Sequence, residues 1–233
     1  MAKFCNLQAA IDCPEYDSDP SIFVSCALDI DAELEEWCTK WQSSFRYATI
    51  IARKMTPDVF EDYWHLYPNI TIALIWNHYR CIRTLVNQII ITQLATMTTN
   101  LDPDLVFQYS SVYNDQMDSS RRMIVELSHQ LCASIPYYLD YYPVEQGDNW
   151  NSSIKCAGRN ARAKLILWPL YVTGQTECIS DIMRMWVIER LEELSMEIGT
   201  HKLKAKGLAT LLRNRQRALG QAWRQLGMED EYQ

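Results

Sequence analysis

The chain has 233 residues, of which 48% are hydrophobic, so it can bury a sizeable core as one large domain. Its net charge of −7 argues against a large nucleic-acid-binding surface, and no nucleic-acid partner is expected. The first residues contain neither a long apolar run nor a small-residue cleavage site, which excludes a secretory signal and predicts a cytoplasmic location. No linker rich in Pro, Gly or Ser divides the sequence, so residues 1–233 are expected to form a single domain.

The first third of the chain predicts helices. A short helix is expected over residues 2–12 and an amphipathic one over residues 21–40, whose acidic run is interpreted as a solvated face. Thr56 followed by Pro57 has the pattern of an N-cap and a first helical position, which predicts another helix start. Because few segments alternate apolar and polar residues, a sheet is not expected.

The stretch over about residues 68–98 predicts a central helix. It contains no Pro or Gly and is apolar on nearly every side, as in a helix covered by other helices. Polar side chains interrupt it too often for a membrane span, so no membrane insertion is predicted. Large polar side chains in its middle favour either a satisfied buried network or the floor of a ligand pocket.

The second half of the chain predicts further helices. Two are expected over residues 103–113 and 117–134, with Pro136 ending the second. The aromatic loop over residues 137–150 is interpreted as either a lid or the mouth of a pocket. A helical segment kinked at Trp168-Pro169 follows, then helices over residues 181–198, capped by Ser180, and 201–226.

The cysteines and histidines do not predict a metal site. The eight cysteines are scattered without CxxC spacing, which favours free, mostly buried thiols. The four histidines fall on separate predicted elements without a nearby ligand partner. The sequence also has no nucleotide-binding or metalloprotease motif, so neither a metal nor a cofactor is predicted.

Six segments together suggest a family. They are ALDIDAELEEW (27–37), WHLYPNI (64–70), IALIWNHYRCIRTLVNQII (72–90), SHQLCASIPYYL (128–139), LILWPLYVTG (165–174) and WVIERLEELSMEIGTHKLKA (186–205). In order and spacing they resemble the C-terminal regulatory domain of fungal binuclear zinc-cluster transcription factors. This resemblance implies an all-α fold and an effector-sensing or regulatory role in fungal metabolism. The family's six-cysteine DNA-binding cluster does not occur in this sequence.

Two functions are compatible with these features, and the missing cysteine cluster favours the first over the second. The first is a stand-alone pocket protein of fungal secondary metabolism for a hydrophobic, terpenoid or polyketide-like molecule. In its simplest form it is a cofactor-free cyclase of the pericyclase (Diels–Alderase) kind, which needs a shaped apolar cavity and a hydrogen-bond donor. The second is a non-enzymatic effector-binding domain of a zinc-cluster transcription factor, with a nuclear location. The sequence allows a homodimer in either case.

The predicted site lies beside the middle of the central helix. It faces the kinked Trp168-Pro169 segment, with residues 137–142 over its mouth. The candidate catalytic donors are Asn77, Tyr79, Arg83 and Tyr137, and the candidate substrate-binding residues are Trp76, His78, Arg80, Tyr138, Trp168 and Trp186.

Overall fold

The computed structural model describes residues 2–13, 19–52, 56–100, 103–139, 162, 164–197 and 202–225. Over these residues the fold is all-α with one small two-stranded sheet, which confirms the predicted fold class. The elements are α1 (Ala2–Ile11), α2 (Pro20–Trp41), β1 (Ala48–Ile51), β2 (Tyr63–Leu66), α3 (Ile70–Asn100), α4 (Pro103–Tyr138), the 3₁₀ turn η2 (Lys164–Ile166), α6 (Leu167–Gln175), α7 (Asp181–Glu197) and α8 (Lys202–Gln225).

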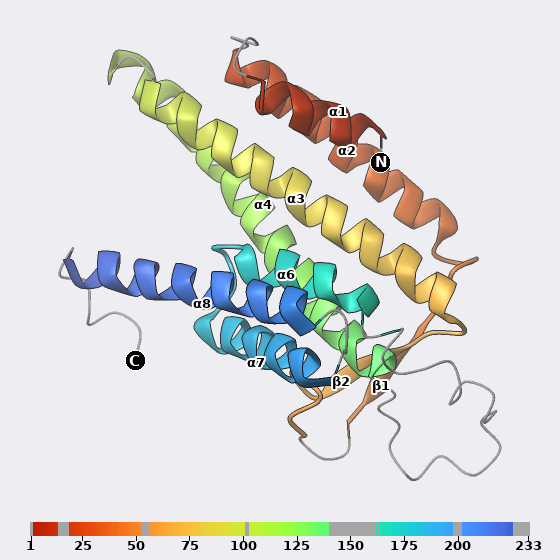
Figure 1. Ribbon diagram of the computed structural model, residues 1–233. Helices are drawn as coiled ribbons and strands as arrows, with labels where there is room; N and C mark the ends of the chain where they lie inside the picture. The colour runs from red at the N-terminus through yellow and green to blue at the C-terminus, as the bar shows by residue number, and fades with distance from the viewer. Residues whose placement is uncertain are drawn as a thin grey trace, which may run out of the picture.

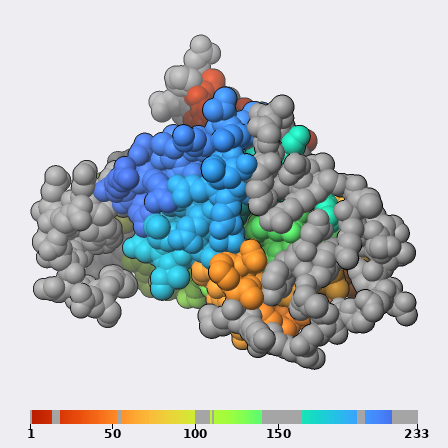
Figure 2. All heavy atoms as spheres, turned by 60° about the horizontal axis from the view of Figure 1, so that its bottom comes forward, coloured from red at the N-terminus to blue at the C-terminus, as the bar shows by residue number. Residues whose placement is uncertain are grey.

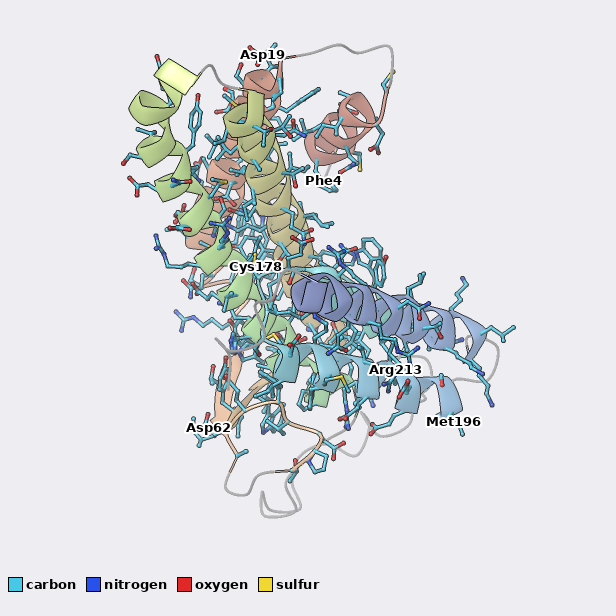
Figure 3. All side chains as sticks on the ribbon, turned by 90° about the vertical axis from the view of Figure 1, so that its left-hand side faces the viewer. Phe4, Asp19, Asp62, Cys178, Met196 and Arg213 are labelled. Carbon is cyan, nitrogen blue, oxygen red and sulfur yellow. The ribbon has the colours of Figure 1, made fainter. Side chains whose placement is uncertain are left out.

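The helices form two groups. The long helices α2, α3 and α4 lie side by side, and α1 packs on α2 (Figure 1). The second group contains α6, α7 and α8, and its helices run across the long ones (Figure 3). Helix α6 contacts α3 and α4 as well as α7 and α8, so it joins the two groups.

Helix α3 is the central helix that the sequence predicts. It begins after Asn69, whose side-chain oxygen accepts a hydrogen bond from the backbone N–H of Ile72 at 3.0 Å. Ala73, Val86 and Ile90 on this helix are fully buried. The first half of α3 belongs to the larger core with α4, α6, α7 and α8, and the second half belongs to a smaller core with α1 and α2. The predicted bounds of about 68–98 agree with the structure to within two residues.

The prediction of two helices over residues 103–113 and 117–134, with Pro136 ending the second, is wrong. Helix α4 is one continuous helix that passes through Pro136 and ends at Tyr138. An internal proline costs about 3 kcal/mol because one amide donor is lost and one carbonyl is crowded. Here Ile135, Tyr137 and Tyr138 are buried in the larger core, and that burial offsets the cost. Tertiary packing has overridden local propensity.

The region after Trp41 also differs from prediction. No described residue after Pro57 begins a helix before α3; a turn leads instead into β2. Strands β1 and β2 pair antiparallel, with Thr49 opposite His65 and Ile50 opposite Trp64. The sheet escaped prediction because β1 is mostly exposed while Trp64 and His65 are both buried, so neither strand alternates.

The described cysteines are free, as predicted, but they are not mostly buried. Among the seven described cysteines, Cys81 and Cys132 are buried and the other five are exposed or half-buried. Cys156 lies outside the described residues. No helix in the described part of the chain has both the length and the apolar character needed to cross a bilayer.

Two helical glycines test the packing of the second helix group. A Cβ at Gly174 would press against Leu212 and lie 3.1 Å from Val187 Cγ1, whereas a Cβ at Gly207 would meet no atom within 4 Å. We expect Gly174→Ala to lower the free energy of unfolding by about 1–2 kcal/mol, because overpacking against the buried Leu212 outweighs the gain in helix propensity. Gly207→Ala should raise it by up to about 1 kcal/mol through helix propensity. Urea unfolding measures both, and a neutral Gly174→Ala would contradict the close approach of α6 to α8.

Candidate functional site

The polar side chains of α3 form two separate clusters. In the first, Arg83 makes a two-point ion pair with Asp31 of α2, through Nε at 2.9 Å and Nη2 at 3.0 Å. Arg83 Nη1 also donates to the Tyr79 hydroxyl at 2.9 Å, and Asn87 Nδ2 donates to Asp31 at 2.8 Å. A bidentate pair of this kind fixes geometry as well as charge. This cluster ties α2 to α3.

The second cluster surrounds Arg80, which is 0% exposed. Its Nη1 donates to the Tyr67 hydroxyl at 2.6 Å and to Asn77 Oδ1 at 3.1 Å, and its Nε donates to Gln130 Oε1 at 3.2 Å. The remaining nitrogen, Nη2, lies 3.5 Å from His65 Nδ1. None of these acceptors is a carboxylate, and among the described residues no carboxylate forms an ion pair with Arg80.

The neighbours of Arg80 are uncharged at physiological pH. Burial, followed by the charge of Arg80, lowers the pKa of His65 to about 3. Burial raises the pKa of Tyr67 to about 12 even though Arg80 acts in the opposite direction. Burial also raises the pKa of Tyr138, whose hydroxyl accepts a hydrogen bond from Asn77 Nδ2 at 3.3 Å. Arg80 is therefore an isolated positive charge among these neutral groups.

Aromatic rings complete the enclosure of this charge. The guanidinium carbon of Arg80 lies 5.2 Å from the ring centroid of Tyr47, 5.5 Å from that of Trp76 and 6.0 Å from that of Tyr67. The negative ring faces attract a cation, with about 2 kcal/mol available when the pair is desolvated. Trp76 is held in place because its Nε1 donates to the carbonyl of Phe45 at 2.6 Å.

A hollow of about 500 Å³ lies beside two of these rings, and we call it the Tyr47–Trp76 hollow. It is formed by the end of α2, the segment leading into β1, and α3. Among the described residues, neither Asp nor Glu lines it, and Tyr47 and Trp76 belong both to the hollow and to the ring cage around Arg80. The lining residues are Thr39, Gln42, Ser43, Arg46, Tyr47, Thr49 and Trp76.

The structure brings some of the predicted site residues together. Trp76 lines the hollow, while Asn77, Arg80 and Tyr138 form the buried cluster behind it. Tyr137 is buried next to this cluster, with its ring centroid 5.2 Å from that of Tyr67. The candidate donors Tyr79 and Arg83 belong instead to the Asp31 network.

Other predicted residues lie elsewhere. His78 is exposed, with Nδ1 2.8 Å from the carbonyl oxygen of Leu74. Trp168 is 53% exposed on α6, and Trp186 of α7 donates from Nε1 to the carbonyl of Pro57 at 2.9 Å. The cavity beside Trp76 thus opens between α2 and β1, not toward Trp168-Pro169. Residues 140–150 of the predicted mouth lie outside the described residues.

Sequence reasoning missed most of the residues around Arg80 and the hollow, and Tyr67 is one of them. Arg46 and Tyr47 follow α2, His65 lies in β2, and Gln130 lies in α4. The stretch that contains His65 is one of the six segments that carry the family resemblance, but nothing in its pattern indicates contact with α3. Such contacts between distant segments have no local periodicity to reveal them.

In the described part of the chain, no group of three or more His, Cys, Asp or Glu side chains is placed to hold a metal ion. Comparisons with family models, curated proteins and solved structures found no match.

The burial of His65 predicts that the folding stability of the protein decreases in mild acid. The pKa of His65 is about 3 in the folded protein and about 6.5 when unfolded, so the unfolded state binds the proton first as the pH falls. Folding stability should therefore decrease by about 1.4 kcal/mol per pH unit below about pH 6.5. Urea unfolding between about pH 7 and pH 5 measures this slope, before most carboxylates titrate.

The matched control is the exposed His78. His65→Gln should flatten the slope, whereas His78→Gln should leave it unchanged. The same slope in wild type and His65→Gln would contradict a buried, neutral His65.

Proposed function

We propose that the chain binds a small organic anion with an aromatic or apolar body in the Tyr47–Trp76 hollow, and that it serves as an effector-binding regulatory domain. The observation that carries this proposal is Arg80, a fully buried guanidinium with neutral partners, next to two rings that line the hollow. Removing a charge from water costs several kcal/mol, and a carboxylate partner normally offsets that cost. Because no carboxylate among the described residues pairs with Arg80, its field acts on a molecule in the hollow.

The electrostatic attraction is large enough to select an anion. A ligand charge stacked on Tyr47 or Trp76 would lie about 9 Å from the guanidinium, and an effective dielectric constant of about 20 gives about 2 kcal/mol. Arg46 in the lining adds a second positive charge, which is weaker because it is exposed and screened by salt.

One feature of the hollow opposes an anion. The C-terminal end of α2 carries partial negative charge on its last carbonyl groups. The carbonyl of Trp41, however, accepts hydrogen bonds from the N–H groups of Ser44 at 2.9 Å and Phe45 at 3.0 Å. An exposed helix end contributes about 0.3–1 kcal/mol, so the two cations outweigh it.

The lining also indicates the body of the ligand. Tyr47, with the exposed edge of Trp76, provides aromatic surface, and the hydroxyls of Ser43 and Thr49 provide hydrogen bonds. The hydroxyl of Thr39 donates to the carbonyl of Glu35 at 3.0 Å. A volume of about 500 Å³ lies within the range of small-molecule pockets. A polyketide-like aromatic acid or phenolate combines these properties. The class of expected ligands, which the sequence left as terpenoid or polyketide-like, is thereby restricted to aromatic anions.

The geometry supports binding more than cyclisation. Carbonyl activation needs a donor directed at the substrate, but Asn77, Tyr79 and Arg83 take part in hydrogen bonds within the protein. A binding role also agrees with the effector sensing that the family resemblance implies. The cyclase hypothesis stays a prediction, and turnover of a polyene carbonyl compound above the spontaneous rate would support it.

Two dyes with the same aromatic body test the preference for an anion. Anilinonaphthalene sulfonate carries a negative charge, whereas phenylnaphthylamine is neutral. We expect the anionic dye to bind about tenfold more tightly in fluorescence titrations, because most of the attraction from Arg80 is retained in the hollow. Ser43→Trp, which fills the hollow, should abolish the binding of both dyes.

A pair of surface variants provides the charge control. Arg46→Gln should lower the affinity for the anionic dye about threefold without changing the affinity for the neutral dye. Lys40→Gln removes a cation at the same helix end, but outside the lining of the hollow. It should change the affinity for neither dye. Near-ultraviolet circular dichroism must show native packing, because such dyes also bind expanded states. Equal affinities for the two dyes, or binding that Ser43→Trp leaves intact, would refute the proposal.

The two central arginines give a further test. Arg83→Met leaves Asp31 without its charged partner, although Asn87 still donates to it, so we expect it to lower the free energy of unfolding by about 2–4 kcal/mol. Arg80→Met leaves no carboxylate unpaired but removes the donor from the buried acceptors on Tyr67, Asn77 and Gln130, so its cost should be similar. It should also remove most of the preference for the anionic dye. If Arg80→Met keeps that preference and a native fold, the buried charge does not determine ligand choice.

A further inference from the structure

Helix α8 has two apolar faces, but only the first packs against α6 and α7. Ala205, Ala209 and Leu212 are buried on the first face, toward α6 and α7. Leu203, Gly207 and Leu211 recur every four residues and form a stripe on a second face. Leu203 is 81% exposed and Leu211 is 57% exposed. Apolar side chains that gather in this way at a surface mark an interaction site.

The stripe forms one wall of a groove of about 560 Å³, and we call it the α6–α8 groove. Leu167 and Trp168 of α6 form the facing wall, and Trp168 is 53% exposed. Gly207 leaves open space in the α8 wall, since an added Cβ would meet no atom within 4 Å. Helix α8 lies beside α7 at the molecular surface (Figure 2). The described residues of the lining are Lys164, Leu167, Trp168, Leu203, Lys204, Gly207, Leu208 and Leu211.

The charges at the groove select the partner. Lys164 stands on the α6 side and Lys204 on the α8 side, and none of the described residues that line the groove is acidic. The groove is therefore locally basic although the whole chain has a net charge of −7. Complementary charge at an interface raises the association rate and excludes wrong partners.

We propose that the α6–α8 groove docks an amphipathic helix of a partner protein, with leucine-type anchors along one face and acidic residues beside them. Helices commonly bind in apolar grooves through anchors at positions i, i+4 and i+7, and the lysines of both walls would meet the acidic flanks. Trp168 would provide the large aromatic contact typical of interface hot spots. A groove between two helices favours a helical partner over a membrane, since membrane-binding helices present an apolar face that inserts into lipid.

The probe is a labelled peptide of about 18 residues, long enough to form a helix, with Leu anchors at that spacing and Glu beside them. A second peptide has the same anchors with Lys in place of Glu. Fluorescence anisotropy should show saturable binding of the acidic peptide to the full chain, weakened by salt, and at least about tenfold weaker binding of the basic peptide.

Two kinds of variant locate the binding. Lys204→Glu reverses a charge in the lining, while Lys206→Glu reverses one on the same exposed helix but outside the lining. Lys204→Glu should lower the affinity for the acidic peptide about threefold to tenfold more than Lys206→Glu does. Gly207→Gln projects a side chain into the groove and should abolish binding. Its melting temperature should not fall, because the site is open and Gln is a better helix former than Gly.

The outcomes decide between partners. Selective loss of peptide binding in Lys204→Glu and Gly207→Gln supports the proposal, and recovery of the basic peptide by a Lys164→Glu, Lys204→Glu double variant would strengthen it. Absence of acidic-peptide binding, or binding that Gly207→Gln leaves intact, overturns it. So does binding only to anionic lipid vesicles. A dimer that sedimentation detects in wild type and not in Gly207→Gln would assign the groove to a second copy of the chain instead.

Discussion

The ion pair between Arg83 and Asp31 sets the position of α2 on the central helix, and the candidate site depends on that position. Trp37 of α2 then lies 6.0 Å from Trp76 and 6.2 Å from Phe45, measured between ring centroids. The carbonyl of Phe45 accepts the indole N–H of Trp76. This series of contacts fixes the segment that carries Tyr47, so the ring cage and the hollow follow from how α2 meets α3.

Two arginines one turn apart have different energetic consequences. Arg83 has a carboxylate partner and joins two helices, which accounts for it as a structural residue. Arg80 is more deeply buried, and its partners are a phenol, two amides and an imidazole, all neutral. Arg80 also joins α3 to α4 through Gln130, but none of its described partners offsets its charge, and costs of this kind tend to mark functional sites. The neutral hydrogen bonds and the rings reduce the cost of burying Arg80, yet leave its charge available to a ligand.

The sequence predicts elements that depend on local patterns. Helix α3 was predicted because the absence of Pro and Gly and its apolar surface are readable within one window. Pro136 misled the prediction because burial of its neighbours, not local propensity, decides where α4 ends. The cage around Arg80 could not be predicted from the sequence, because Tyr47, His65 and Gln130 come from three segments that are far apart in the chain. Trp168 was expected at a pocket with Trp76, but a mostly apolar segment does not reveal which of its faces meets the core.

The proposed ligand hollow and the proposed docking groove rest on the same packed core. Tyr47 and Leu208 pack on the edge of this core, and Trp76, Leu167 and Leu212 are inside it. Helix α6 contacts both α3 and α8, so it spans the interval between the two sites. A close-packed core transmits small displacements because it has no free volume to absorb them. An effector domain must let a ligand change the affinity for a partner, and that coupling would have to act equally in both directions. Helix α6 forms one wall of the groove and packs on α3, the helix that carries Trp76, so it is a suitable physical basis for such coupling.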